Sequence, residues 1–295
     1  MTNAESPLVS IGLPVRNAGR DIENVVKSVL SQDYPNLEMV ISDNESTDDT
    51  EEVCRELARA DDRIVYHRQP QNVGILRNFQ FVAAHARGTY FRWIGDDDTL
   101  DPAFAAKCVA LFESDPRLVL VTTQISYGAP DGSVSTAEYH GTDLASDDPI
   151  VRLREMLHLL NASHLLIDPL YAMARRETLT SIPRRNMLRE DEVFAAKLAL
   201  AGPWRHIPEV LAQRHWKHER IGTIAGRLGV PSWQSHFSNT LQCRELLSWA
   251  GEAPGLTPEQ RRQAKSAIYR MYLRRQQRTV SHKSRKLARL AIGRR

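Results

Sequence analysis

The chain has 295 residues, of which 42% are hydrophobic and 25% are charged. A chain of this length and balance can bury a large apolar core, so the composition excludes disordered and fibrous classes of protein. Its three cysteines form no CxxC or zinc-ligand spacing, no run of eighteen apolar residues occurs, and residues 1–10 lack the pattern of a secretory leader. We therefore expect a cytoplasmic protein without a membrane-spanning segment.

Charge is spread unevenly along the chain, although the formal net charge is only +3. Residues 260–295 hold 13 Lys and Arg side chains and no acidic one, whereas residues 1–259 hold 26 basic and 36 acidic side chains, a net charge of −10. A basic tail suits an anionic partner, either a membrane surface or nucleic acid. The acidic body opposes nucleic acid, so we expect none to bind.

The first hundred residues alternate between strand and helix patterns. Short apolar runs predict strands at 8–15, 37–42, 63–68 and 89–94, and apolar residues at helical spacing predict helices at 22–30, 50–60 and 75–86. This βαβα order predicts an α/β fold with a mostly parallel central sheet and helices on both faces.

The pattern is less regular after Pro102. Helices are predicted at 102–112, 151–160 and 190–201, a strand at 118–126, and an extended segment at 166–174. Residues 128–148 are rich in Gly, Ser, Asp and Pro and predict a loop or hairpin, and the chain is mainly helical from about residue 220.

Three consecutive aspartates, Asp96, Asp97 and Asp98, directly follow the strand predicted at 89–94. Ligands of open α/β sheets bind beyond the carboxyl ends of the strands. Adjacent carboxylates repel one another unless a cation or protons neutralise them, and Mg²⁺ or Mn²⁺ prefers oxygen ligands. The triplet therefore predicts a metal and diphosphate site, with a solvated acidic turn as the alternative.

Five short motifs precede the aspartates in a fixed order. They are VSIGLPVRN at 9–17, SVLSQDYP at 28–35, ISDNESTDDT at 41–50, NVG at 72–74 and ARGTY at 86–90. Together with the aspartates they resemble family 2 glycosyltransferases of the GT-A fold, over about residues 8–220. The resemblance implies an enzyme that transfers a sugar, of the hexosyltransferase class, from a nucleoside-diphosphate sugar with inversion.

The resemblance also implies three regions. Residues 1–101 form the nucleotide-sugar-binding half, and residues 102–220 form the acceptor-binding and catalytic half of the same GT-A-like domain. Residues 221–295 form a helical, basic C-terminal extension.

Similarity to the family assigns a group of residues at the ends of the early strands to the nucleotide. They are Pro14, Arg16, Asn17, Asp43, Asn44 and Arg77, together with Asp96 and Asp97. A carboxylate at Asp43 can accept a hydrogen bond from a uracil-type imide, but Asn44 replaces the family's frequent second aspartate and leaves the base open. The alternatives are a turn aspartate for Asp43 and a surface arginine for Arg77.

Residues 99–102 match the family's downstream pattern and make Asp97 and Asp98 the matching pair, so the resemblance implies Asp98, with Asp97, as metal ligands. Asp96 then stands at a variable position, and Gly95 stands where many relatives have an acid. Residues 209–220 resemble the segment that closes over the nucleotide. From it His218, or His215 in its place, can supply an imidazole nitrogen to the metal.

Inverting transfer needs a second carboxylate, away from the leaving diphosphate, to take the acceptor's hydroxyl proton. Glu190 and Asp191 open the helix predicted at 190–201 and resemble the family's Glu-Asp motif. Asp191 is then the base, and Glu190 orients Asp191 or the acceptor. The alternative is that these acids only favour the start of a helix through its dipole.

The expected function is therefore a Mn²⁺- or Mg²⁺-dependent transferase that acts on a glycan or lipid-linked acceptor in bacterial surface polysaccharide biosynthesis. In the tail, apolar residues at helical spacing, which are Ala264, Ile268, Met271 and Tyr272, predict a helix peripheral at the inner face of the plasma membrane. A solvated terminal helix is the alternative there. The competing functions are a sugar nucleotidyltransferase, whose glycine-rich phosphate loop residues 14–19 do not provide, and a nucleic-acid-binding protein.

Overall fold

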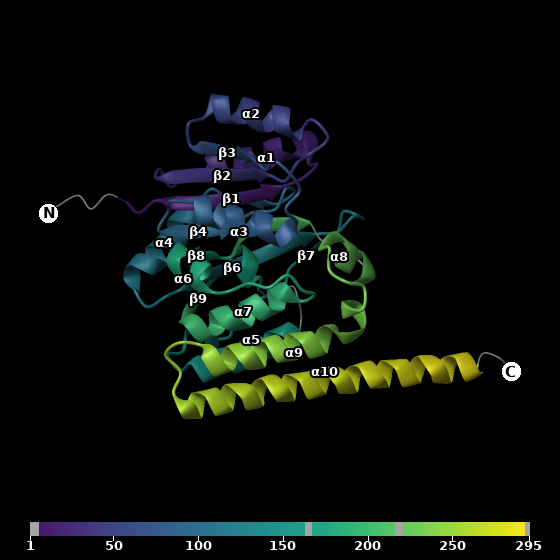
Figure 1. Ribbon diagram of the computed structural model, residues 1–295. Helices are drawn as coiled ribbons and strands as arrows, with labels where there is room; N and C mark the ends of the chain where they lie inside the picture. The colour runs from purple at the N-terminus through teal and green to yellow at the C-terminus, as the bar shows by residue number, and fades with distance from the viewer. Residues whose placement is uncertain (1–5, 163–166, 216–220, 293–295) are drawn as a thin grey trace.

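The structure is a computed structural model that describes residues 6–162, 167–215 and 221–292 (Figure 1). Its strands are β1 (Val9–Val15), β2 (Leu37–Asp43), β3 (Ile64–Arg68), β4 (Tyr90–Trp93), β5 (Thr99–Leu100), β6 (Leu120–Gly128), β7 (Val134–Ser135), β8 (Met173–Arg175) and β9 (Trp204–His215). Its α-helices are α1 (Ile22–Leu30), α2 (Thr50–Ala60), α3 (Ile75–His85), α4 (Phe104–Ser114), α5 (Pro149–Ala162), α6 (Arg176–Ser181), α7 (Glu190–Ala201), α8 (Ile221–Arg227), α9 (Gln234–Glu252) and α10 (Pro258–Ile292).

One sheet runs through the described residues in the order β3-β2-β1-β4-β8-β6-β9-β5, with β7 beside β6. The strands β3, β2, β1 and β4 are parallel, as predicted from the βαβα order. Every residue of β2 is buried, including the polar residues Glu38, Ser42 and Asp43, as expected for a strand covered on both faces. Because these strands are parallel, the segments that follow β1, β2 and β4 lie at the same edge of the sheet.

Two apolar cores cover the two faces of this sheet. Alternate residues of β1, such as Ile11 and Leu13, pack with α1, α2 and α4, whereas Phe91 and Trp93 of β4 pack with α3, α5 and α7 on the opposite face. The predicted α/β fold with helices on both faces is therefore confirmed.

Beyond β4 the sheet is mixed, which makes it less parallel than expected. The strand β8 is antiparallel to both β4 and β6, β6 is parallel to β9, and β5 is antiparallel to β9. The long strand β9 is absent from the sequence prediction. Its pairing with β6 shifts register around Gln124, and its middle residues Pro208, Glu209 and Val210 are exposed, so it lacks the regular alternation that predicts a strand.

The C-terminal extension is helical, as predicted, and forms a third core with the main fold. The helices α9 and α10 lie side by side, and α10 also packs on α5 (Figure 1). Ala264, Ile268 and Met271 of α10 are buried in this core. The prediction that these three residues face a membrane is therefore wrong, because α5 and α9 cover them. None of the described helices combines the length and the apolar character needed to cross a bilayer.

A buried polar cluster joins β1 and β2 to the segment that enters β4. Glu38 of β2 accepts hydrogen bonds from the Ser10 hydroxyl (2.6 Å) and from the Arg87 backbone N–H (2.7 Å). The Gly88 N–H in turn donates to the Ser10 hydroxyl (2.8 Å). A Cβ on Gly88 would lie 2.5 Å from that hydroxyl oxygen and 2.7 Å from the Leu8 carbonyl oxygen. Only glycine fits where the chain enters β4.

Replacing Gly88 with alanine should destabilise the fold by about 2 kcal/mol, because the strand entering β4 must move away from β1. The free energy of unfolding in urea measures this. Gly226→Ala is the matched control, since Gly226 lies within α8 with no atom near its Cβ position, and there alanine should be neutral or stabilising by up to about 1 kcal/mol. Equal stability of the two variants would contradict the argument.

Candidate active site

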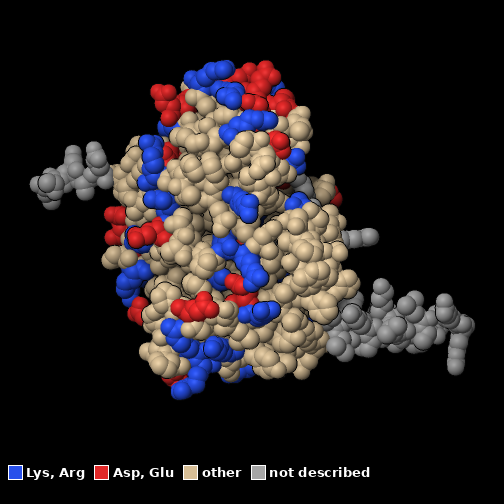
Figure 2. Space-filling view, in the orientation of Figure 1, with Lys and Arg blue, Asp and Glu red and all other residues tan. Residues whose placement is uncertain are grey.

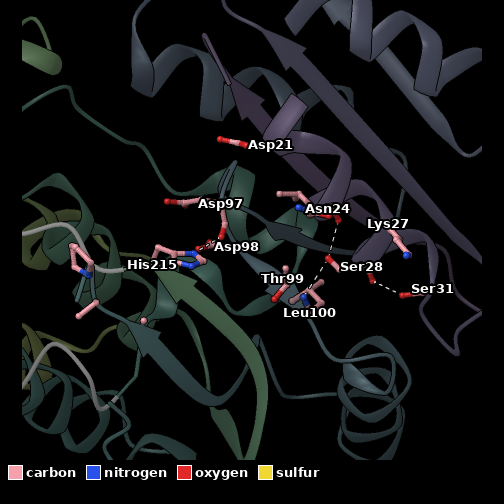
Figure 3. Close-up of a pocket in the computed structure, with 14 residues that line it drawn as sticks. Asp21, Asn24, Lys27, Ser28, Ser31, Asp97, Asp98, Thr99, Leu100 and His215 are labelled. Carbon is pink, nitrogen blue, oxygen red and sulfur yellow. Dashed lines mark hydrogen bonds between the residues drawn. The ribbon is translucent and has the colours of Figure 1, made fainter. Parts of the chain in front are cut away.

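A cleft of about 770 Å³ opens beside the aspartate triplet. It lies between α1, the turn that carries Asp97 and Asp98, the end of β6, and His215 at the end of β9. Figure 3 shows Asp97, Asp98 and His215 close together, with Asn24 and Ser28 of α1 along the same cleft. Asp97 and Asp98 therefore line a cavity at the carboxyl edge of the sheet, so the triplet is not a fully solvated turn.

Asp98 is almost completely buried, with 1% of its surface exposed. Its Oδ2 atom accepts hydrogen bonds from the Gly95 N–H and from Arg214 Nε, both at 3.1 Å, whereas its buried Oδ1 atom has no hydrogen-bond partner among the described residues. A Cβ on Gly95 would lie 2.9 Å from Oδ2. This explains why glycine stands at that position, since a side chain there would displace the Asp98 carboxylate.

Arg214 of β9 is a central residue of the site that the sequence prediction missed. It forms ion pairs with Asp98 and with Asp168, and its guanidinium lies 3.5 Å from the centre of the Tyr171 ring. Burial opposes its charge, but Tyr171, Asp168 and Asp98 more than offset that effect and raise the pKa of Arg214. The sequence did not predict Arg214 because it did not predict the strand β9. Arg214 nevertheless lies in the segment 209–220, whose histidines are the predicted metal ligands.

A second buried cation, Arg92 of β4, lies near Asp98. Its Nε donates to the Tyr171 carbonyl (2.7 Å), its guanidinium stacks over Phe104, and its two terminal nitrogens have no hydrogen-bond partner among the described residues. Burial lowers its pKa to about 10, so it is still charged near neutral pH. The sequence gives one indication that Arg92 is buried, since it stands within the aromatic run of β4.

Of the two candidate histidines, His215 lies at the aspartates, and His218 is outside the described residues. His215 Nδ1 is 2.6 Å from the Asp97 carbonyl oxygen. Because a carbonyl only accepts, Nδ1 carries the proton, which leaves Nε2 as a lone-pair donor. Among the described residues no three His, Cys, Asp or Glu side chains converge to form a metal site by themselves.

Glu190 and Asp191 form the first turn of α7, as predicted, and their carboxylates differ. Glu190 is partly buried and accepts two hydrogen bonds of 2.6 Å from Arg184. Asp191 is exposed, yet desolvation by the surrounding protein and the charges of Glu192, Glu190 and Asp168 raise its pKa to about 6. Asp191 is thus open to solvent and holds its proton more tightly than an ordinary aspartate.

Asp191 and the aspartate triplet belong to one region of the molecule. Asp168, which contributes to the raised pKa of Asp191, is the residue that Arg214 binds, and Arg214 also binds Asp98. Asp168 is the N-cap of the short 3-10 helix Pro169–Tyr171, which packs against both α7 and β4. The two carboxylate sites predicted from sequence are therefore separate but linked through Asp168 and Arg214.

The predicted nucleotide residues fall into two groups. Asp43 and Asn44 are buried and bonded within the protein: Asp43 accepts from the Ser46 N–H, Tyr66 and Arg68, and Asn44 bonds to the loop at 72–73. These bonds suit the turn role that was the alternative for Asp43.

The second group is exposed or partly exposed. Pro14 is half-buried near the end of β1, and Arg16 and Asn17 follow it with exposed side chains. Asn17 has a positive φ of 55° and accepts from the Thr47 N–H (2.9 Å), so it holds the loop after β2. Arg77 is exposed on α3. Pro14, Arg16 and Asn17 thus lie at the carboxyl end of β1, and Arg77 lies on α3. None of the four lines the cleft.

Residues 10–180, more than half of the chain, match the sequence model of glycosyl transferase family 2. The chain belongs to this family. The glycosyltransferase is 32% identical over 141 residues to the chondroitin synthase of Pasteurella multocida (strain Pm70), an alignment that covers 48% of this chain but only 14% of that protein's length. The predicted family and the predicted enzyme class are therefore confirmed.

Solved structures agree on the fold of the glycosyltransferase. Residues 1–349 of S. aureus TarS in complex with UDP-GlcNAc superpose with a TM-score of 0.63 and 16% identity, covering 90% of this chain and 72% of that one. The mannosyltransferase PcManGT from Pyrobaculum calidifontis in complex with GDP-Man and Mn²⁺ has a TM-score of 0.52 and 17% identity, covering 91% and 74%. These likenesses support the GT-A fold.

Proposed function

We propose that this glycosyltransferase is metal-dependent and inverting, and that it moves a sugar from a nucleoside-diphosphate sugar to a glycan or lipid-linked acceptor in polysaccharide biosynthesis. The observation that carries the proposal is the buried Asp98 carboxylate at the cleft, whose Oδ1 atom has no hydrogen-bond partner among the described residues. A second carboxylate with a raised pKa, Asp191, lies on a separate helix. Residues 1–101 are the donor half in this proposal, and residues 102–220 are the acceptor half.

The side chains at the cleft fit a divalent cation. A buried carboxylate oxygen without a hydrogen-bond donor is a ready ligand for a hard cation, and Mg²⁺ commonly uses one or two carboxylates together with substrate phosphates. Asp98, with Asp97, would hold the ion, His215 Nε2 is within the same cleft, and His218 remains the other predicted ligand. When bound, the metal would stabilise the negative charge that develops on the leaving diphosphate.

The chain's own residues supply the remaining chemistry. Arg214 is partly exposed and presents a permanent positive charge beside Asp98, where it can bind a diphosphate oxygen. Asp191 accepts the proton of the acceptor hydroxyl as the new glycosidic bond forms. Glu190 is held by Arg184, so it fixes the first turn of α7 and thereby orients Asp191.

The donor base is open in this proposal, because Asp43 and Asn44 are bonded within the protein. TarS was solved with UDP-GlcNAc and PcManGT with GDP-Man, so uridine and guanosine diphosphate sugars are the first donors to test. The family match leaves the sugar nucleotidyltransferase alternative without support. Release of pyrophosphate from a nucleoside triphosphate and a sugar phosphate would revive it.

A panel of nucleoside diphosphates and their sugars, with Mn²⁺ or Mg²⁺, should contain a ligand that raises the melting temperature of the protein. With that donor, transfer or donor hydrolysis should stop in chelator and fall at least about 100-fold in Asp98→Ala, which removes the ligand carboxylate. Asp62→Ala, which changes an exposed aspartate between α2 and β3 that does not line the cleft, is the comparison for general effects of substitution. Full activity in chelator would remove the metal from the proposal.

On the acid side of the pH profile, kcat/KM should fall about tenfold for each pH unit below about pH 6, because Asp191 must be ionised to act as the base. Asp191→Asn should lower kcat at least about 100-fold and abolish this acid limb.

The folded protein holds the Asp191 proton more tightly than the unfolded chain, so ionisation of Asp191 lowers the free energy of unfolding as pH rises from about 4 to 6. Asp191→Asn should therefore melt no lower than wild type at pH 7, and an unchanged kcat would exclude Asp191 as the base.

We also propose that the enzyme is cytoplasmic and meets an anionic membrane through the outward face of α10 within 260–295. Tyr269 and Leu273 are 52% and 42% exposed on this face, and Arg270 is exposed between them. Basic side chains gather at the lower edge of Figure 2, where α10 begins in Figure 1. Aromatic and apolar residues among arginines suit the interface of an anionic bilayer.

The full-length protein should float with phosphatidylglycerol-containing vesicles and not with pure phosphatidylcholine vesicles, and high salt should release it. Replacing both Tyr269 and Leu273 with serine should weaken flotation, because their apolar surface enters the interface. If wild-type protein stays unbound to the anionic vesicles, this part of the proposal fails.

A further inference from the structure

A buried arginine of the C-terminal helix lies at the meeting point of four helices. Arg275 of α10 is only 7% exposed, although arginine is usually a surface residue. Its Nε donates to Asn161 Oδ1 and one terminal nitrogen donates to the Leu160 carbonyl, each at 2.9 Å, so two bonds reach α5. The other terminal nitrogen donates to Gln242 Oε1 of α9 at 2.7 Å.

The same terminal nitrogen of Arg275 forms an ion pair of 2.6 Å with Glu192 Oε2 of α7. Glu192 directly follows Asp191 in the first turn of α7. Its carboxylate also receives a bond from Arg189 at Oε1 (2.5 Å) and from Gln242 Nε2 at Oε2 (3.0 Å). Residue Glu192 is therefore held by the chain before α7, by α9 and by α10 at once.

The charges around Asp191 come from every element packed on this turn. Within α7, Glu190 is paired with Arg184, and Glu192 is paired with Arg189 and Arg275. From the segment before β8, Asp168 faces Asp191 and is paired with Arg214. Each acid near Asp191 is thus paired with arginine, and of these arginines only Arg275, one of the two partners of Glu192, comes from the C-terminal extension.

We propose that Arg275 is a positioning residue for the transfer reaction, because it fixes the charge and the place of Glu192 beside the base Asp191. This inference rests on the proposed function. A partly buried carboxylate that loses one of its two arginines either turns outward or keeps a less compensated charge. The first outcome loosens the turn that carries Asp191, and the second raises the cost of ionising Asp191. The C-terminal extension is in this way part of the catalytic machinery.

The test measures the titration of Asp191 by NMR of protein labelled with ¹³C at the aspartate carboxyl groups, with the signal assigned through Asp191→Asn. In Arg275→Gln the midpoint of Asp191 should move to higher pH by about half a unit, because the charge of Glu192 is less compensated. In Arg275→Lys, which keeps the charge, it should stay nearer the wild-type value. Arg274→Gln, the exposed neighbour on α10, is the matched control and should titrate as wild type.

Glu192→Gln keeps the inference falsifiable if Arg275→Gln does not fold. This variant removes the negative charge next to Asp191, so the midpoint should move to lower pH. Circular dichroism and thermal melting establish which variants are folded. A folded Arg275→Gln, or a folded Glu192→Gln, in which Asp191 titrates as in wild type would overturn the inference.

The failure of this inference is distinguishable from the failure of the proposed function, because the NMR titration needs no substrate. Once a donor is known, the acid limb of kcat/KM should move to higher pH in Arg275→Gln together with the NMR midpoint, while KM for the donor changes little. A merely structural role for Arg275 would lower the melting temperature without moving the limb. A shifted NMR midpoint in a protein without transferase activity would refute the function and leave the electrostatic coupling standing.

Discussion

The candidate site depends on the ion pairs that Arg214 makes with Asp98 and Asp168. Asp98 follows β4, Asp168 precedes β8, and Arg214 ends β9, so these pairs join three parts of the sheet that are far apart in the chain. Asp98 is almost fully buried, and a buried carboxylate without a cation costs several kcal/mol. Arg214 supplies that cation and binds only Oδ2, so Oδ1 has no hydrogen-bond partner among the described residues. The strand order β4-β8-β6-β9 in the mixed half of the sheet therefore places Arg214 beside Asp98 and Asp168.

The sequence predicted those elements whose pattern is local. The helices α2 and α7 begin and end at the predicted residues, and β1 to β4 lie within one or two residues of prediction, because apolar runs and helical spacing decide them. The strand β9 was not predictable in this way, since its middle is exposed and its partner β6 has a bulge. Arg92 and Arg214 were missed for a related reason. A buried arginine is recognised only through its partners, and these come from distant strands.

The acid-rich first turn of α7 is also explained by contacts rather than by its own sequence. A helix dipole favours acidic residues in a first turn whatever surrounds them. Here Glu190 and Glu192 are each bound by arginines, and Asp191 between them is exposed and forms no ion pair with an arginine of the described residues. Two of the three acids thus hold the turn in place, and the third meets solvent. This arrangement separates a structural pair from a chemically available carboxylate, which the dipole alone does not do.

The packing of α10 has a consequence for how the protein matures during synthesis. Ala264, Ile268 and Met271 complete the core that α5, α7 and α9 begin, and Arg275 completes the bonds around Glu192. A chain emerging from the ribosome can assemble its parallel half early, because β1 to β4 and their helices are close in sequence. The turn that carries Asp191 has to wait until residue 275 has left the exit tunnel. In nascent chains and truncated products, the parallel half of the sheet should therefore form before the first turn of α7 is held in place.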